Sequence, residues 1–112
     1  MVEQRHMGDV VILEPRGAMM GGPETADFQI TLEELLSKGL TKIVVDLKGV
    51  RWVNAAAIGV LVEALTRLRE MRGDLRLARC CERTGSILHL VKMESLFCSY
   101  YDTPDTAAAS FA

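Results

Sequence analysis

Hydrophobic positions along the chain follow two different spacings, which predict alternating strands and helices. Residues 10–13 are all aliphatic, as is typical of a strand covered on both faces. Lys42–Leu47 is rich in β-branched residues and predicts a buried central strand. Between these runs, apolar residues recur at i, i+4, i+7 and i+8 from Phe28, which predicts a helix with one buried face. Pro23 suits the first position of that helix, and Gly39 suits a left-handed cap at its end.

The clearest helical pattern follows an apolar strand segment that contains Trp52 and ends at Asn54. Asn54 is a good N-cap, and an apolar stripe at helical spacing runs from Ile58 to Leu68. Gly73 is expected to stop the helix. We expect Trp52 to anchor the core.

The remaining segments complete the order β-β-α-β-α-β-α-β-α. Strands that alternate with helices favour right-handed crossovers into a largely parallel sheet, so we expect an α/β fold in a single domain over residues 1–112. The other expected elements are strands at about Val2–His6, Val10–Pro15, Leu75–Ala78 and Phe97–Tyr101, a turn at 7–9, a flexible segment at 17–23, a helix at about Glu82–Lys92, and a terminal helix capped by Thr103.

Composition narrows the classes of function. The chain has 112 residues, 25% of them charged, and a formal net charge of −2. This balance gives no electrostatic reason to expect binding to nucleic acid or to an anionic membrane surface. No apolar run approaches the roughly 20 residues of a membrane span, and the N-terminus lacks a signal-peptide pattern, so we expect a cytoplasmic protein.

No residue pattern indicates catalysis, a metal or a cofactor. Cys80 and Cys81 are adjacent, which makes a disulfide between them strained, and Cys98 stands alone. His6 and His89 are far apart with no acidic partners in a ligand pattern. No serine has an adjacent His or Asp arrangement that would activate it, so we expect a protein that is not an enzyme.

The order of elements and the residues at their corners resemble the STAS domain of bacterial anti-sigma factor antagonists, over essentially the whole chain. The resemblance implies a mixed, mostly parallel sheet with helices packed mainly on one face. Its most specific segments are Lys42–Leu47, Val53-Asn54 with three small residues and Ile58-Gly59, Gly73–Leu77, the ending from Phe97 to Phe111, and the variant segment Met20–Thr25.

The resemblance also identifies a regulatory corner after Asn54. In the family this corner usually has an acidic or amide residue, two hydroxyl residues and a glycine. Here Asn54 takes the first position, Ala55 and Ala56 the hydroxyl positions, and Ala57 the glycine position. Ala56 falls where a partner kinase phosphorylates the usual serine, and Met20 stands where many relatives have an aspartate. Members with the serine bind a kinase-type anti-sigma factor when unmodified and release it when phosphorylated.

We therefore predict a protein-binding regulator whose docking surface has lost covalent control. A phosphoserine would add about −2 charge to a surface that must dock, whereas alanine cannot accept phosphate. The expected partner is an anti-sigma factor kinase or another signalling protein. The predicted partner-binding residues are Met19, Met20, Gly21, Gly22, Asn54, Ala55, Ala56, Ala57 and Ile58.

Plainer interpretations stay open at this stage. Asn54 is first of all a cap, the alanines could simply pack against the sheet, and Met19 and Met20 could pack under their loop. The domain could instead be a scaffold, or an assembly subunit of a signalling complex or a membrane lipid transporter. A small-ligand sensor would need a pocket that the sequence does not show, and the sequence leaves open whether the protein forms a homodimer.

Overall fold

The computed structural model describes residues 2–79, 100–101 and 103–111. Its main sheet has five strands in the order β1-β2-β4-β6-β7. The β1–β2 pair is antiparallel and the other three pairs are parallel. The expected mixed, mostly parallel sheet is therefore confirmed. The strands are β1 (Glu3–Met7), β2 (Val10–Glu14), β4 (Lys42–Asp46), β6 (Asp74–Ala78) and β7 (Tyr100–Tyr101).

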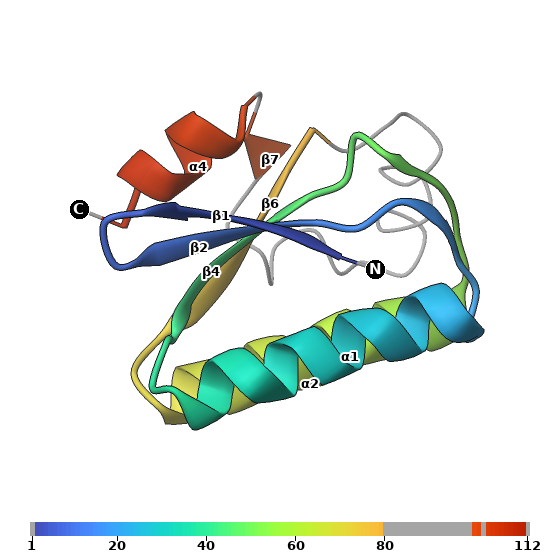
Figure 1. Cartoon of the computed structure of the whole chain (residues 1–112), viewed down its shortest axis with the longest axis horizontal. Coiled ribbons are helices and arrows are strands. Elements are labelled where there is room, and N and C mark those ends of the chain that lie inside the picture. Colours follow the sequence, from blue (N-terminus) through green and yellow to red (C-terminus); the bar gives the residue numbers. More distant parts are fainter. Residues whose placement is uncertain (1, 80–99, 102, 112) are drawn as a thin grey trace.

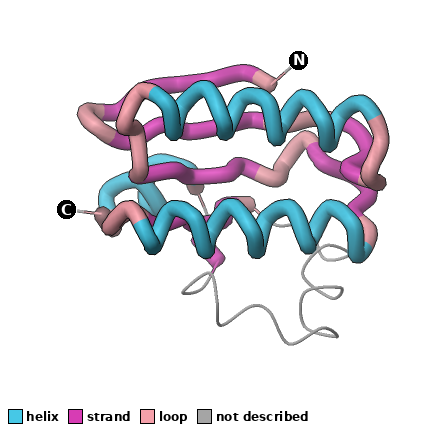
Figure 2. The backbone as a smooth tube through the Cα atoms, turned by 90° about the horizontal axis from the view of Figure 1, so that it is seen from below, coloured by secondary structure: helices cyan, strands magenta, loops and turns pink. Residues whose placement is uncertain are grey.

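Two long helices cover one face of this sheet and a short helix covers the other (Figure 1). The long helices are α1 (Pro23–Ser37) and α2 (Ala55–Glu70), which lie side by side beneath the sheet (Figure 2). The short helix is α4 (Pro104–Ala109), and the Thr103 hydroxyl caps it by accepting from the Thr106 N–H at 3.1 Å. The expected placement of the helices, mainly on one face, is confirmed.

Successive residues of the central strands face opposite layers, which explains their unbroken apolar runs. Val11 and Leu13 of β2 pack with Ile43 and Val45 of β4 in the large core under α1 and α2. Their neighbours Val10, Ile12 and Val44 pack with Ala107 and Ala108 of α4 in the smaller core. Both faces of β2 and β4 are thus withdrawn from water, as in parallel sheets generally.

A second, two-stranded sheet lies beyond the ends of β2 and β4. It pairs β3 (Gly17–Met19) with β5 (Val50–Val53) in parallel. The expectation that residues 17–23 are a flexible segment was wrong for β3. Three residues have no periodicity of their own, and their strand conformation depends on hydrogen bonding to a partner far along the chain.

Trp52 does not anchor the core, and that expectation is corrected. Its side chain is 51% exposed, whereas Val50 and Val53 on either side are buried. The cause is an irregularity in the pairing: Gly17 lies opposite Val50, but the next residue, Ala18, lies opposite Trp52. One extra residue in β5 reverses the alternation of inward and outward side chains, so the indole faces outward.

The two long helices end with the same pattern of backbone hydrogen bonds, but the glycine after each helix has a different role. After α1, Gly39 has a φ of +77°, as expected for a left-handed cap. After α2, Arg72 takes the left-handed conformation with a φ of +63°, so Gly73 is not the residue that turns the chain. A Cβ at Gly73 would lie 2.0 Å from the backbone oxygen of Thr41. Gly73 is therefore needed because two loops approach closely there.

Some expected elements fall outside the described residues. The helix expected at about Glu82–Lys92, residues 97–99 of the last strand, and the three cysteines are among them. In the part of the chain that the structure describes, no helix is long and apolar enough to cross a membrane.

Candidate functional site

The site predicted from the sequence lies where β5 ends and α2 begins. Asn54 has an extended backbone, and its side-chain oxygen accepts a hydrogen bond from the Ala57 N–H at 3.1 Å. Its backbone oxygen accepts from the Ile58 N–H, also at 3.1 Å. The N-cap role expected for Asn54 is confirmed.

Asn54 also fastens the loop that follows β3. Its side-chain amide donates to the backbone oxygen of Met20 at 3.1 Å. On the other side of the loop, the Gly21 N–H donates to the hydroxyl of buried Thr25 in α1 at 3.0 Å. The loop is thereby held between the first turns of the two long helices, and segments more than 30 residues apart form one surface.

Gly21 and Ala56 lie close together where the loop meets the helix. Gly21 has a φ of +86°, a conformation that L side chains rarely adopt. A Cβ placed on Gly21 would lie 3.4 Å from the Cβ of Ala56, which is ordinary van der Waals contact. The methyl group of Ala56 therefore lies near the loop, with room between them for no more than a small group.

Burial separates the predicted site residues into two sets. Met20 is 48% exposed, and Gly21, Ala55 and Ala56 are also exposed, with Gly22 and Asn54 partly so. The side chains of Ala57 and Ile58 are 0% and 3% exposed and belong to the large core. Met19 is the last residue of β3 and pairs with Val53 of β5. The surface that a partner could touch is thus narrower than the predicted set.

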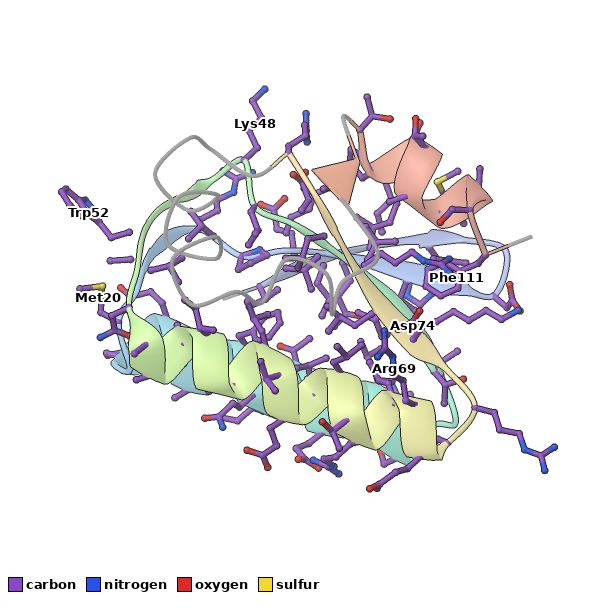
Figure 3. The ribbon with its side chains drawn as sticks, turned by 180° about the vertical axis from the view of Figure 1, so that it is seen from behind. Met20, Lys48, Trp52, Arg69, Asp74 and Phe111 are labelled. Atoms are coloured by element: carbon purple, nitrogen blue, oxygen red, sulfur yellow. The ribbon has the colours of Figure 1, made fainter. Side chains whose placement is uncertain are left out.

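Two further residues, not among those predicted, extend this exposed surface. Trp52 lies at the same end of the molecule as Met20, and of the two Met20 is nearer the start of α2 (Figure 3). Gly59, one turn into α2, is exposed and has open space where a side chain would be. We call this surface the apolar corner, and it consists of Met20, Gly21, Trp52, Ala55, Ala56 and Gly59.

The chemistry of the apolar corner suits contact rather than catalysis. None of its six residues has a titratable or hydroxyl-bearing side chain, and α2 has no acidic residue in its first turn. Contiguous exposed apolar patches on a surface commonly mark sites of protein contact. Across the described residues, no three His, Cys, Asp or Glu side chains are grouped so that they could hold a metal ion.

The double role of Asn54 gives a testable prediction for stability. We expect Asn54→Ala to lower the free energy of unfolding by about 1–2 kcal/mol, because it removes the cap and the bond to the loop. Asn54→Asp keeps the cap acceptor and cannot donate to Met20, so it should cost less than Asn54→Ala. Urea unfolding of the three proteins measures both differences. Equal losses in the two variants would show that the cap contributes nothing.

This chain is similar to known proteins both in sequence and in structure. A family model described as STAS domain matches residues 1–107. No curated protein matches the sequence significantly. A candidate anti-sigma factor antagonist from Thermotoga maritima has a similar structure, with 25% sequence identity and a TM-score of 0.88. The match covers 97% of this chain and 92% of that chain.

More distant structures share the fold. SpoIIAA, a Bacillus cell fate determinant solved in its phosphorylated form, is 10% identical with a TM-score of 0.78, and the match covers 100% of both chains. A sulfate transporter family protein from Wolinella succinogenes is 18% identical with a TM-score of 0.78, over 93% of this chain and 85% of that chain. At these identities the likeness concerns the arrangement of strands and helices.

Proposed function

Because this chain belongs to the STAS domain family, we propose that it is a protein-binding regulator of the anti-sigma factor antagonist type. Its partner would be an anti-sigma factor of the serine-kinase class, bound at the apolar corner in the cytoplasm. The resemblance to the Thermotoga maritima protein supports the general role. The observation that supports the surface is the joining of Met20 and Gly21 to the first turn of α2 in one exposed, uncharged patch.

The energetics of docking favour this surface over the rest of α2. Burial of apolar side chains at an interface releases water, and aromatic residues are common among those that contribute most to binding. No residue from 54 to 62 has a charge that a partner would have to desolvate, whereas residues 63–70 include four charged side chains. We propose that the whole function requires one domain over residues 1–112 and no catalytic step by this chain.

Ala56 makes the proposed regulator insensitive to its kinase. Ala55 and Ala56 are both exposed at the start of α2, where a hydroxyl group would be open to phosphorylation. Their methyl groups offer no atom to phosphorylate. The proposed regulator is therefore competent to dock at all times. Its effect would then depend on how much of the protein the cell contains, or on competition with other proteins for the same partner.

The first experiment identifies the partner. Affinity purification of the wild-type protein from its native cell should recover an anti-sigma factor with a serine-kinase domain, identified by mass spectrometry. Recovery of transporter components or of scaffold proteins, without such a kinase, would contradict the proposal and favour an assembly role.

Restoring the hydroxyl group tests the regulatory part separately. With the purified kinase and ATP, wild-type protein should gain no phosphate at residues 54–58, while Ala56→Ser should gain one. Ala55→Ser is the matched control, because it adds the same hydroxyl group at the neighbouring exposed position and should remain unmodified. Intact-mass spectrometry counts the phosphates on the three proteins, and tandem mass spectrometry of their peptides locates them. An Ala56→Ser protein that stays unmodified, or phosphate on Ala55→Ser alone, would be incompatible with the position assigned to Ala56.

A further inference from the structure

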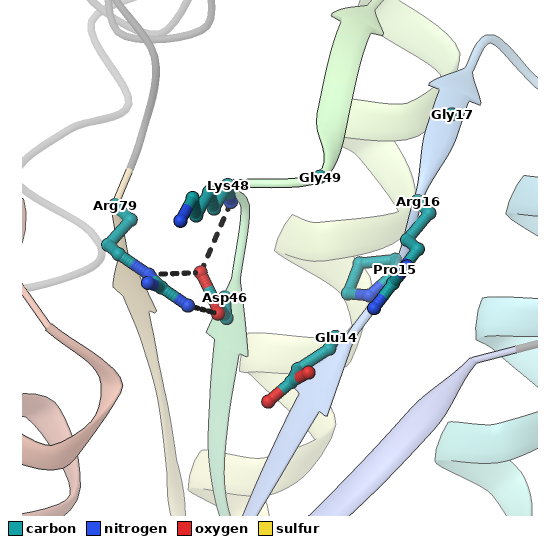
Figure 4. Close-up of a pocket in the computed structure, with 8 residues that line it drawn as sticks. All are labelled: Glu14, Pro15, Arg16, Gly17, Asp46, Lys48, Gly49 and Arg79. Atoms are coloured by element: carbon teal, nitrogen blue, oxygen red, sulfur yellow. Dashed lines mark hydrogen bonds and ion pairs between the residues drawn. The ribbon is translucent and has the colours of Figure 1, made fainter.

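A cavity of about 730 Å³ lies at the carboxyl ends of three parallel strands. Glu14 and Asp46 end β2 and β4, and Arg79 directly follows β6 (Figure 4). Sheets with parallel strands commonly bind ligands in the crevice outside these ends. None of the residues that line the cavity belongs to the apolar corner. The lining residues are Glu14, Pro15, Arg16, Gly17, Asp46, Lys48, Gly49 and Arg79.

Asp46 and Arg79 form a fixed ion pair at one side of the cavity. Asp46 is 3% exposed, and one of its carboxylate oxygens accepts from Arg79 Nε at 3.0 Å and from the Lys48 N–H at 3.1 Å. Its other oxygen accepts from a terminal nitrogen of the same guanidinium. This bonding to Asp46 raises the pKa of Arg79 above its ordinary value. Both oxygens of Asp46 are therefore occupied, which leaves a cation little to bind.

The backbone of Arg79, the residue paired with Asp46, has an unusual conformation. Arg79 has a φ of +52°, in the left-handed region that a long side chain rarely adopts. Residues held in such conformations are frequent at ligand sites, where surrounding structure fixes them. Here the ion pair holds the guanidinium across the end of the sheet, and its remaining N–H groups can still donate.

The charges of the lining favour an anion. Three cationic side chains, Arg16, Lys48 and Arg79, face two carboxylates, Glu14 and Asp46, so the lining has an excess of positive charge. Arg16 Nη2 lies 3.3 Å from Glu3 Oε2, and Glu14 Oε1 lies 3.8 Å from Arg5 Nε. Arg16 and Glu14 therefore each form an ion pair with a residue that does not line the cavity. Within the described residues, the Lys48 ammonium has no ion pair.

Two glycines, Gly17 and Gly49, line the cavity beside Pro15 and Arg16. The Gly17 N–H donates to the Gly49 backbone oxygen at 2.9 Å, joining the two glycines. A Cβ at Gly49 would lie 3.0 Å from Arg16 Cγ and 3.2 Å from the Pro15 oxygen, so a larger residue would crowd Pro15 and Arg16.

We propose that this cavity binds a small organic anion through a phosphate or carboxylate group, held by the Lys48 ammonium and the outer N–H groups of Arg79. Charge-assisted hydrogen bonds to guanidinium and ammonium groups are the strong contacts such anions make in proteins. The cavity is far larger than one phosphate ion, so the rest of the ligand would lie toward Glu14, which can accept a hydrogen bond from it.

Titration of the ¹⁵N-labelled full chain at constant ionic strength, with inorganic phosphate and separately with citrate, tests this site. We expect saturable amide shifts at residues 14–17 and 46–49 and at Arg79, and the tighter probe distinguishes a phosphate from a carboxylate ligand. Lys48→Gln should weaken binding about tenfold, the effect of losing one charged contact. Lys38→Gln removes the same charge from an exposed residue at the end of α1 and should leave the affinity unchanged.

Two results would overturn the proposal. One is the absence of saturable shifts around the cavity with either probe at millimolar concentration. The other is an equal loss of affinity in Lys48→Gln and Lys38→Gln, which would mean that the anions respond only to overall charge. Because Lys48 is exposed, its substitution should leave the fold intact, and the amide spectrum of the variant checks this directly.

Discussion

Ala56→Glu is expected to weaken binding of the anti-sigma partner by at least about 100-fold, because an interface would then bury an unpaired carboxylate. Ala56 is exposed at the start of α2 and lies near the loop at Gly21, so the longer side chain must project into the docking space. A carboxylate near a helix N-terminus is favourable, so the variant should fold as well as the wild type. Isothermal titration of the purified partner measures the affinity.

Two matched variants separate the causes of that loss. Ala56→Gln has nearly the same shape without the charge and should weaken binding less. Ala109→Glu introduces the same side chain at an exposed alanine of α4, on the opposite face of the sheet, and should bind like the wild type. If Ala56→Glu retains wild-type affinity, the partner does not cover the start of α2.

Gly73→Ala is expected to lower the free energy of unfolding by about 3 kcal/mol or more, through overpacking against backbone. The new Cβ would lie 2.0 Å from the Thr41 oxygen, and that oxygen already accepts the Asp74 N–H at 3.0 Å. Neither atom belongs to a flexible side chain, so the loop between α1 and β4 would have to move. Chemical denaturation monitored by circular dichroism measures the change.

Gly59→Ala is the control, and its expected change in the free energy of unfolding has the opposite sign. Gly59 lies within α2, is exposed, and has open space around the position of a Cβ. Alanine is the better helix former, so this variant should gain up to about 1 kcal/mol of stability. A stable Gly73→Ala protein would mean that the two loops are not packed as closely as the structure has them.

The main sheet and the long helices could be predicted because their signals are local. The aliphatic run at residues 10–13 and the spacing from Phe28 reflect which faces each element buries. Asn54 could be identified as a cap because its side chain bonds only three residues ahead. The resemblance of the segments around Asn54 then identified the family, which the match to residues 1–107 confirms.

The features that could not be predicted depend on partners distant in the chain. The outward turn of Trp52 follows from one extra residue in the pairing of β5 with β3, which no pattern in either short strand indicates. The bond from Asn54 to the Met20 backbone, and the ion pair of Asp46 with Arg79, each join residues more than 30 positions apart. The cavity beside the second of these pairs was not indicated by the sequence.

Mapping the partner on the ¹⁵N-labelled protein by NMR is the most direct test of the proposed docking surface. With the purified anti-sigma factor, we expect the largest amide changes at residues 20–22, at Trp52 and at residues 54–56 and 59. The face covered by α4 should be unaffected. Changes centred on α4 or on β1, with the apolar corner unchanged, would contradict the proposed docking surface.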